Sequence, residues 1–125
     1  MAYLAKLKID GNDKEHILTN VQYHFHQGVD KNCKPNTAVF GGHVQFVVQS
    51  TDDTSFAEWM VAPDKQNGGE ITFYDADGNK EIKKVKFEKA HCVNYSEVYD
   101  GNGAREHITI ASKKVTIGNA EHENE

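Results

Sequence analysis

Three histidines are the residues whose type and spacing come nearest to a metal site. His24 and His26 stand two apart on one predicted strand, and His43 begins the next long strand. An H-x-H pair with a third ligand can hold a transition metal, as in cupin barrels. A cupin adds a glutamate a few residues on, where this chain has Gln-Gly-Val-Asp at 27–30. The ligand set is incomplete, so we predict no metal site and interpret the histidines as polar residues on a wet or subunit-facing surface.

Other residue sets with chemical potential are also incomplete. The segment 75–81 begins like a calcium loop, but such a loop needs glycine at its sixth position and glutamate at its twelfth. Lys80 and Lys86 occupy those positions. Cys92 follows His91, yet neighbours on a strand point to opposite faces and do not easily form a nucleophile–base pair. We therefore predict no catalytic residue, no cofactor and no enzymatic activity.

Composition limits the chain to a few classes of protein. Its 125 residues fit a single domain, 1–125, long enough to bury a core. A net charge of −5 argues against nucleic-acid binding, and no apolar run is long enough to span a membrane. The N-terminus alternates like a strand and lacks a signal peptide's apolar stretch. Cys33 and Cys92 have no metal or redox spacing, which indicates free thiols in a reducing compartment.

Apolar and polar residues alternate with period two along most of the chain, which is typical of strands with one buried face. The residues expected on the buried faces of the first three strands are Tyr3, Ala5, Leu7 and Ile9, then Ile17, Thr19, Val21, Tyr23 and Phe25, then Val44, Phe46 and Val48. Later strand-like runs are 71–74, 82–87, 92–99 and 107–111, with 115–117 as a short closing strand.

The tripeptide Asp-Gly-Asn occurs three times, at 10–12, 77–79 and 100–102, each time between strand-like runs. Glycine and asparagine tolerate the positive φ that tight hairpin turns require. Three antiparallel hairpins favour a mostly β fold, either a sandwich or a barrel.

One segment has helical rather than strand spacing. Phe56, Trp59 and Met60 stand at i, i+3 and i+4, and the Asp, Thr and Ser residues before them can cap free backbone N–H groups. Pro63 limits the C-terminal end. We predict a short helix at about 52–61 that covers one side of the barrel, with these three residues in the core and Trp59 a core residue rather than part of a ligand cage.

The connection at 27–42, about sixteen residues long, has no period, and compact domains rarely contain such loops unless they bind something. It carries apolar side chains, so we interpret it as an arm that reaches a neighbouring subunit. The residues predicted to make subunit or stacking contacts are Val29, Lys34, Pro35, Val39 and Phe40.

Two charged segments have simple interpretations. The lysines at 83, 84, 86 and 89 suit a solvated strand edge that resists aggregation, or alternatively a contact with an acidic partner. The polar tail 118–125 is expected to be a solvated end, frayed unless something holds it.

Four segments together closely resemble one known family. They are Thr54…Glu58-Trp59-Met60…Pro63, Gly69-Glu-Ile-Thr-Phe-Tyr74, Lys86–Val93 with Tyr95-Ser-Glu97, and Ile117–Glu125. The chain resembles, in order and over nearly its whole length, the inner-tube proteins of type VI secretion. More narrowly, it resembles the divergent TssD branch of the haemolysin-coregulated proteins (Hcp). The tail 118–125 is the most specific piece.

The resemblance implies a small antiparallel β-barrel, or two-sheet barrel, with one short α-helix and a long extended loop. It also implies a structural, non-enzymatic subunit that forms hexameric rings. Such rings stack into a hollow tube, related to phage tail tubes, that a contracting sheath drives outward and that carries effectors. The implied partners are further copies of the chain and the sheath, spike and effector proteins, with no nucleic acid and no membrane insertion. Assembly would occur in the bacterial cytoplasm, with export by the secretion machine and without a signal peptide.

Two alternatives lead to different experiments. A monomeric ligand-binding barrel of lipocalin type would need an apolar cavity, whereas aromatic and β-branched residues are expected to fill this core. A cupin-like metal enzyme would need His24 and His26 as ligands. If the tube interpretation holds, we expect a mostly polar lumen lined by outward residues such as Gln22, His24 or Gln45.

Overall fold

The computed structural model describes residues 4–11, 14–25, 27, 29–34, 41–51, 53–75, 77 and 80–123. Within these residues the strands are β1 (Leu4–Ile9), β2 (Glu15–Tyr23), β3 (His43–Gln49), β4 (Asn67–Tyr74), β5 (Glu81–Asp100), β6 (Gly103–Ile117) and β7 (Ala120–Glu123). The helix α1 (Ser55–Met60) lies between β3 and β4. It falls inside the predicted range 52–61.

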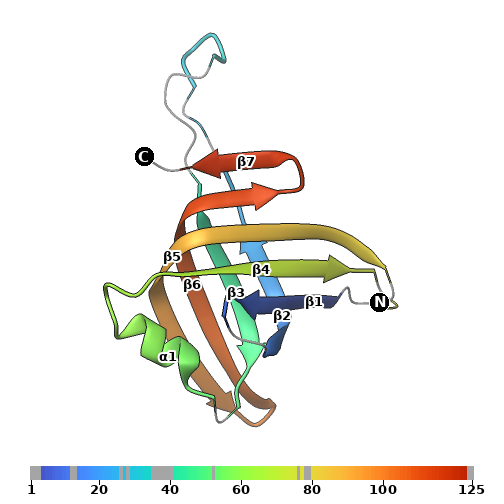
Figure 1. Cartoon of the computed structure of the whole chain (residues 1–125), viewed down its shortest axis with the longest axis vertical. Helices are drawn as coiled ribbons and strands as arrows, with labels where there is room; N and C mark the ends of the chain where they lie inside the picture. The colour runs from blue at the N-terminus through green and yellow to red at the C-terminus, as the bar shows by residue number, and fades with distance from the viewer. Residues whose placement is uncertain are drawn as a thin grey trace.

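The strands form one antiparallel sheet that closes on itself. The order is β3-β2-β1-β4-β5-β6-β7, and an additional β3–β6 pairing joins the first six strands of the chain into a barrel. Strand β7 pairs only with the C-terminal part of β6 and lies outside the closed ring of strands (Figure 1). The prediction of a mostly β, small antiparallel barrel with one short helix is confirmed.

Hairpins join β1 to β2, β4 to β5 and β5 to β6, and each connection contains one of the three Asp-Gly-Asn tripeptides. At the first turn Gly11 adopts a φ of 80°, a conformation that most side chains avoid. At the third, the Asp100 carboxylate accepts a hydrogen bond from the Asn102 backbone N–H at 2.8 Å. Parts of the first two turns, including Asn12 and residues 78–79, lie outside the described residues.

The barrel interior is filled by apolar side chains from all six wall strands and from α1. Leu7, Phe46, Ile71, Phe87 and Ile110 each have at most 1% of their surface exposed. The alternation predicted for β3 is confirmed, because Val44, Phe46 and Val48 are all buried. The ligand-binding alternative needs an apolar cavity where these side chains lie.

On β2 the predicted buried face is partly wrong. Ile17 is 59% exposed, whereas Leu18 is buried and Val21 and Tyr23 pack against the core. The β2–β3 register shifts between Leu18 and Asn20, so two residues of β2 oppose one of β3. Such a β-bulge moves every later side chain to the other face. Ile17 and Val21 therefore point to opposite sides despite their period-two spacing.

The later strands are longer than the sequence pattern indicated. The runs 82–87 and 92–99 belong to the single strand β5, and 107–111 and 115–117 both belong to β6. The register shifts of β5 include one against β6 between Cys92 and Asn94 and one against β4 at Lys89, whose φ is 53°. A bulge changes which face is buried without ending the hydrogen-bond ladder.

The polar tail does not behave as a free end over its described part. Residues Ala120–Glu123 form β7, which pairs with Lys114–Ile117 of β6. The Glu121 carboxylate forms an ion pair with Lys114 across the two strands. The tail was predicted to fray unless something holds it, and the edge of β6 holds its described part.

The helix closes the barrel end away from β7 (Figure 1). Phe56 and Trp59 are buried at 4% and 2% exposure, and Met60 packs against the core from a partly buried position. The Trp59 indole N–H donates to the Lys65 carbonyl at 3.0 Å, which satisfies its one polar atom. No helix in the described part of the chain is long and apolar enough to span a membrane.

Candidate assembly surface

The predicted arm begins where β2 leaves the barrel wall. Its described segment 29–34 stands away from the barrel, at the top of Figure 1. The Asp30 carboxylate accepts hydrogen bonds from the backbone N–H groups of Asn32 at 2.8 Å and Lys34 at 3.0 Å. The Asp30 N–H donates to the Lys34 carbonyl at 2.8 Å. The tip is therefore a turn organised by a single aspartate.

Of the residues predicted to make subunit contacts, two fall in this segment. Val29 is 60% exposed and Lys34 is exposed. Pro35, Val39 and Phe40 lie outside the described residues. An exposed valine on a projecting turn is an apolar group that this chain does not cover.

The base of the arm contacts β7 through an aromatic pair. The Phe25 ring lies 5.3 Å from the His122 ring in an edge-on arrangement. Gly41, on the returning side of the arm, has no room for a side chain, because a Cβ there would lie 2.0 Å from the Phe25 ring. No pattern along the chain predicted this contact, because it joins residues that are far apart in the sequence. We call Phe25, Gly41 and His122 the arm base.

The described sheet has open stretches along several strands, and two of them lie at β7 and at the start of β5. Strand β7 has a partner on one side only, and residues 81–84 of β5 pair with β4 but precede the part of β5 that pairs with β6. Lys83 and Lys84 lie on the second edge, in agreement with the edge interpretation of the lysine run, whereas Lys86 has a strand on each side. Open edges can accept a strand or loop of another chain.

An apolar groove adjoins the open edge of β5. It has a volume of about 390 Å³ and is lined by Val21, Tyr23, Phe73, Tyr74, Ile82 and Lys83. Ile82 is 53% exposed. Its exposure could not be foreseen, because the sequence shows only that it lies in a strand-like run.

The outer face of β2 and β3 is polar. Gln22 and Gln45 are register partners there, and they line a shallow hollow of about 420 Å³ together with His24 and His43. Gln22, His24 and Gln45, the residues suggested for a polar lumen, thus lie on one surface. His26 lies outside the described residues, and no group of three metal-binding side chains occurs among those described.

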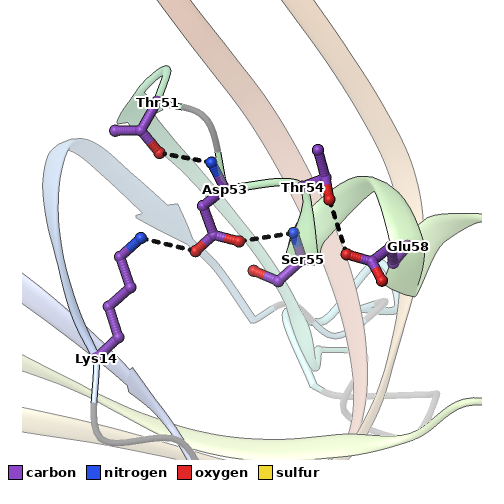
Figure 2. A network of polar contacts seen from close by, with 6 residues as sticks. All are labelled: Lys14, Thr51, Asp53, Thr54, Ser55 and Glu58. Carbon is purple, nitrogen blue, oxygen red and sulfur yellow. Dashed lines mark hydrogen bonds and ion pairs between the residues drawn. The ribbon is translucent and has the colours of Figure 1, made fainter.

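A polar network fixes the start of α1 (Figure 2). The Lys14 ammonium group binds the Asp53 carboxylate at 2.9 Å, and the same carboxylate accepts the Ser55 N–H at 2.9 Å. The Thr51 hydroxyl accepts the Asp53 N–H at 3.1 Å. The hydrogen bond from Lys14, followed by that from Ser55, lowers the pKa of Asp53 to about 2. The helix start is thus capped by Asp53, while the N-cap residue Thr54 bonds Glu58 instead.

His16 and the two cysteines are further groups with chemical potential. Burial lowers the pKa of His16, whose ring lies 4.8 Å from the Phe56 ring. Cys92 is buried, which raises the pKa of its thiol, and Cys33 is exposed at the arm turn; both are free thiols. The described residues thus offer surfaces for contact between chains.

The chain thus combines a closed barrel with a projecting arm and open strand edges. The family model "Hemolysin coregulated protein Hcp (TssD)" matches residues 1–125. The chain therefore belongs to the Hcp (TssD) family. This is the family of type VI secretion tube proteins, a structural family and not a family of enzymes.

Solved structures agree with this assignment. Hcp1 from Flavobacterium johnsoniae is 31% identical, with a TM-score of 0.89 over 97% of this chain and 99% of that chain. Hcp1 from Salmonella typhimurium is 18% identical, with a TM-score of 0.76 over 98% and 95%. A Yersinia pestis protein described as a type VI secretion system effector is 12% identical, with a TM-score of 0.75 over 96% and 99%. No curated protein sequence matches the chain.

Proposed function

We propose that this chain is the structural subunit of a type VI secretion inner tube. It forms hexameric rings that stack into a hollow tube and carry effectors, and it meets the sheath and spike proteins of the machine. Assembly takes place in the bacterial cytoplasm, and the subunit leaves the cell with the tube. The observation that carries this proposal is the family match over residues 1–125, supported by the 31% identical Hcp1 structure.

The surfaces of the chain suit such an assembly. A closed ring needs two different patches that meet with a rotation that closes. The arm and the open edge of β5 with its apolar groove are two such patches. A stable contact of this kind buries roughly 1,200–2,000 Å² in total. Stacking between rings is weaker than ring closure, because tubes form and come apart.

We assign the stacking contact to the arm residues Val29, Lys34, Pro35, Val39 and Phe40. Replacing Val39 and Phe40 together with Asp places two charges where apolar groups would be buried, which is costly at an interface. We expect the monomers of the double variant to fold but not to stack into tubes. Electron microscopy and sedimentation of wild type and variant measure this directly.

The matched control is Val61→Asp, since Val61 is 79% exposed but lies at the end of α1, away from the arm. We expect this control to form tubes like the wild type. Intact tubes and an unchanged sedimentation profile in the Val39/Phe40 variant would reject the stacking assignment. A wild-type protein that stays monomeric at high concentration would reject the tube proposal itself.

A further inference from the structure

Two glutamates lie next to each other at the α1 end of the barrel. Glu97 of β5 and Glu106 of β6 are cross-strand register partners, and Glu106 is also the register partner of Val48 on β3. Glu106 is only 5% exposed, whereas Glu97 is an exposed residue. Two like charges directly opposite each other destabilise a strand pair. The position of the two carboxyl groups therefore favours a state in which they do not both carry charge.

Hydrogen bonds connect the two side chains to their surroundings. The Tyr95 hydroxyl donates to Glu106 Oε1 at 3.1 Å, and the Ser50 hydroxyl donates to Glu97 Oε2 at 2.8 Å. Because Glu97 and Glu106 are register partners, their side chains project from the same face of the strand pair, and the two carboxyl groups can come together. An ionised carboxylate can only accept, so a bond between two carboxyl groups needs a proton on one of them.

The environment decides which group keeps that proton. Burial disfavours the charged form of a carboxyl group, and Glu106 is the buried member. Burial raises the pKa of Glu106, and the carboxylates of Glu97 and Asp53 add to this rise, while the bond from Tyr95 opposes it. Glu97 is exposed and accepts a hydrogen bond from the Ser50 hydroxyl at 2.8 Å.

The nearby cationic groups are engaged elsewhere or held in a neutral form. Lys14 binds Asp53 at 2.9 Å, and burial lowers the pKa of His16. Glu106 lines a cavity of about 260 Å³ with both of them. The titratable or charged groups around Glu106 are Tyr95 and Glu97 of β5, Lys14, Glu15 and His16 at β2, and Asp53 before α1.

We propose that the Glu97–Glu106 pair is a pH-sensitive contact that holds the β5–β6 hairpin to the segment after β3 when Glu106 is protonated. In that state Glu106 donates to Glu97, and Glu97 accepts from Ser50. The Ser50 N–H donates to the Ala104 carbonyl at 3.0 Å, next to the same contact. Loss of the Glu106 proton leaves two facing carboxylates, and their repulsion loosens this end of the barrel. The contact lies within one chain and does not depend on ring assembly.

The direction of the pH effect follows from linkage. A carboxyl group whose pKa is raised by folding adds stability that is complete below its unfolded pKa. This stability is lost as the pH rises through the folded pKa. His16 changes the stability in the opposite direction: because folding lowers its pKa, its contribution to stability increases as the pH rises. Wild type and a Glu106 variant both contain His16, so the difference between their stabilities at each pH reports on Glu106.

The test is Glu106→Gln in the full chain, with the urea midpoint of unfolding measured from pH 5 to pH 9 at fixed protein concentration. Glutamine can accept from Tyr95 and donate to Glu97 but cannot ionise. We expect the wild-type midpoint to fall relative to the variant as the pH rises. Glu15→Gln is the control, because it makes the same change at an exposed residue of the same cavity. Its difference from wild type should stay constant with pH.

A constant difference between wild type and Glu106→Gln across this range would overturn the proposal. Should Glu106→Gln fail to fold, carbon NMR titration of the glutamate carboxyl groups in the wild-type protein gives an independent answer. We expect one carboxyl to titrate above the ordinary range for glutamate and to move toward that range in Glu97→Gln. Titration of all glutamates within the ordinary range would also overturn the proposal.

Discussion

The α1 end and the arm end of the molecule differ in how far their side chains are buried and hydrogen-bonded within one chain. At the α1 end, Phe56 and Trp59 are buried by the same chain, and the indole N–H and the Asp53 carboxylate both have partners. At the arm end, Val29 is 60% exposed and Phe25 is 37% exposed. At the first end, one copy of the chain buries the aromatic side chains of the helix. The second leaves apolar surface that another molecule can cover, which is where we expect assembly contacts.

Trp59→Ala tests the self-contained end and carries the largest expected effect. Removing a buried aromatic side chain typically costs about 3–5 kcal/mol, from lost burial and the cavity left behind. We expect the free energy of unfolding, measured by urea titration, to fall by that amount. Val61→Ala, on the exposed side of the same helix end, should change it by less than about 0.5 kcal/mol. A small effect of Trp59→Ala would mean that α1 is not part of the core.

Asp53→Asn tests the network at the start of α1. The pKa of Asp53 is lowered to about 2, so its contribution is present above the ordinary value of 3.8 and is lost as the pH falls through about 2. Solvent screens the ion pair, because Lys14 is half exposed. We therefore expect Asp53→Asn to lower the free energy of unfolding at pH 7 by about 1 kcal/mol, which is less than the pKa shift of Asp53 alone would give. The cost should shrink toward zero near pH 2.

Urea unfolding at pH 7 and in acid measures the effect of Asp53→Asn. The exposed Asp64, which follows α1, supplies the control Asp64→Asn, for which we expect no measurable loss. Equal stability of Asp53→Asn and wild type at pH 7 would show that the network orders the helix start without stabilising it.

Gly41→Ala tests the arm base and carries the smallest expected effect on global stability. The new Cβ would lie 2.0 Å from the Phe25 ring, which must move away from His122. Because the Phe25 ring can give way without disturbing the core, we expect a change of less than about 0.5 kcal/mol in unfolding free energy. We also expect shifted NMR signals of His122 and faster proteolysis of the arm.

The comparison variant for Gly41→Ala is Gly101→Ala, where a Cβ would meet nothing within 4 Å. It should leave both the His122 signals and arm cleavage unchanged. Unchanged His122 signals in Gly41→Ala would show that Phe25 and β7 do not hold the arm base.

The sequence predicted the parts of the fold that depend on local pattern. Alternation placed Val44, Phe46 and Val48 in the core, and helical spacing identified α1. Ile17 was placed on the wrong face because the bulge after Leu18 depends on the partner strand β3. Strand β7 was missed because its partner edge is created by β6. These features belong to pairs of strands, and a single run of residues does not encode them.

The candidate surfaces show the same division. The arm at 27–42 stays a prediction, because residues 28 and 35–40 lie outside the described residues; in its described part Val29 is exposed. The contact of Phe25 with His122 and the pairing of Glu97 with Glu106 could not be predicted, because each depends on strand register. The family resemblance was most specific in the tail 118–125, but it did not predict that residues 120–123 pair with β6.

The unbroken length of β5 has a mechanical consequence. Its 20 residues, at about 3.3 Å each, give a contour of about 65 Å, and it is hydrogen-bonded to β6 along most of that length. A force along the strand axis acts on many hydrogen bonds between β5 and β6 at the same time, so these bonds together oppose separation of the two strands. The four residues of β7 have far fewer bonds to share the load. Under tension we expect this short strand to detach first, while the two long strands remain joined.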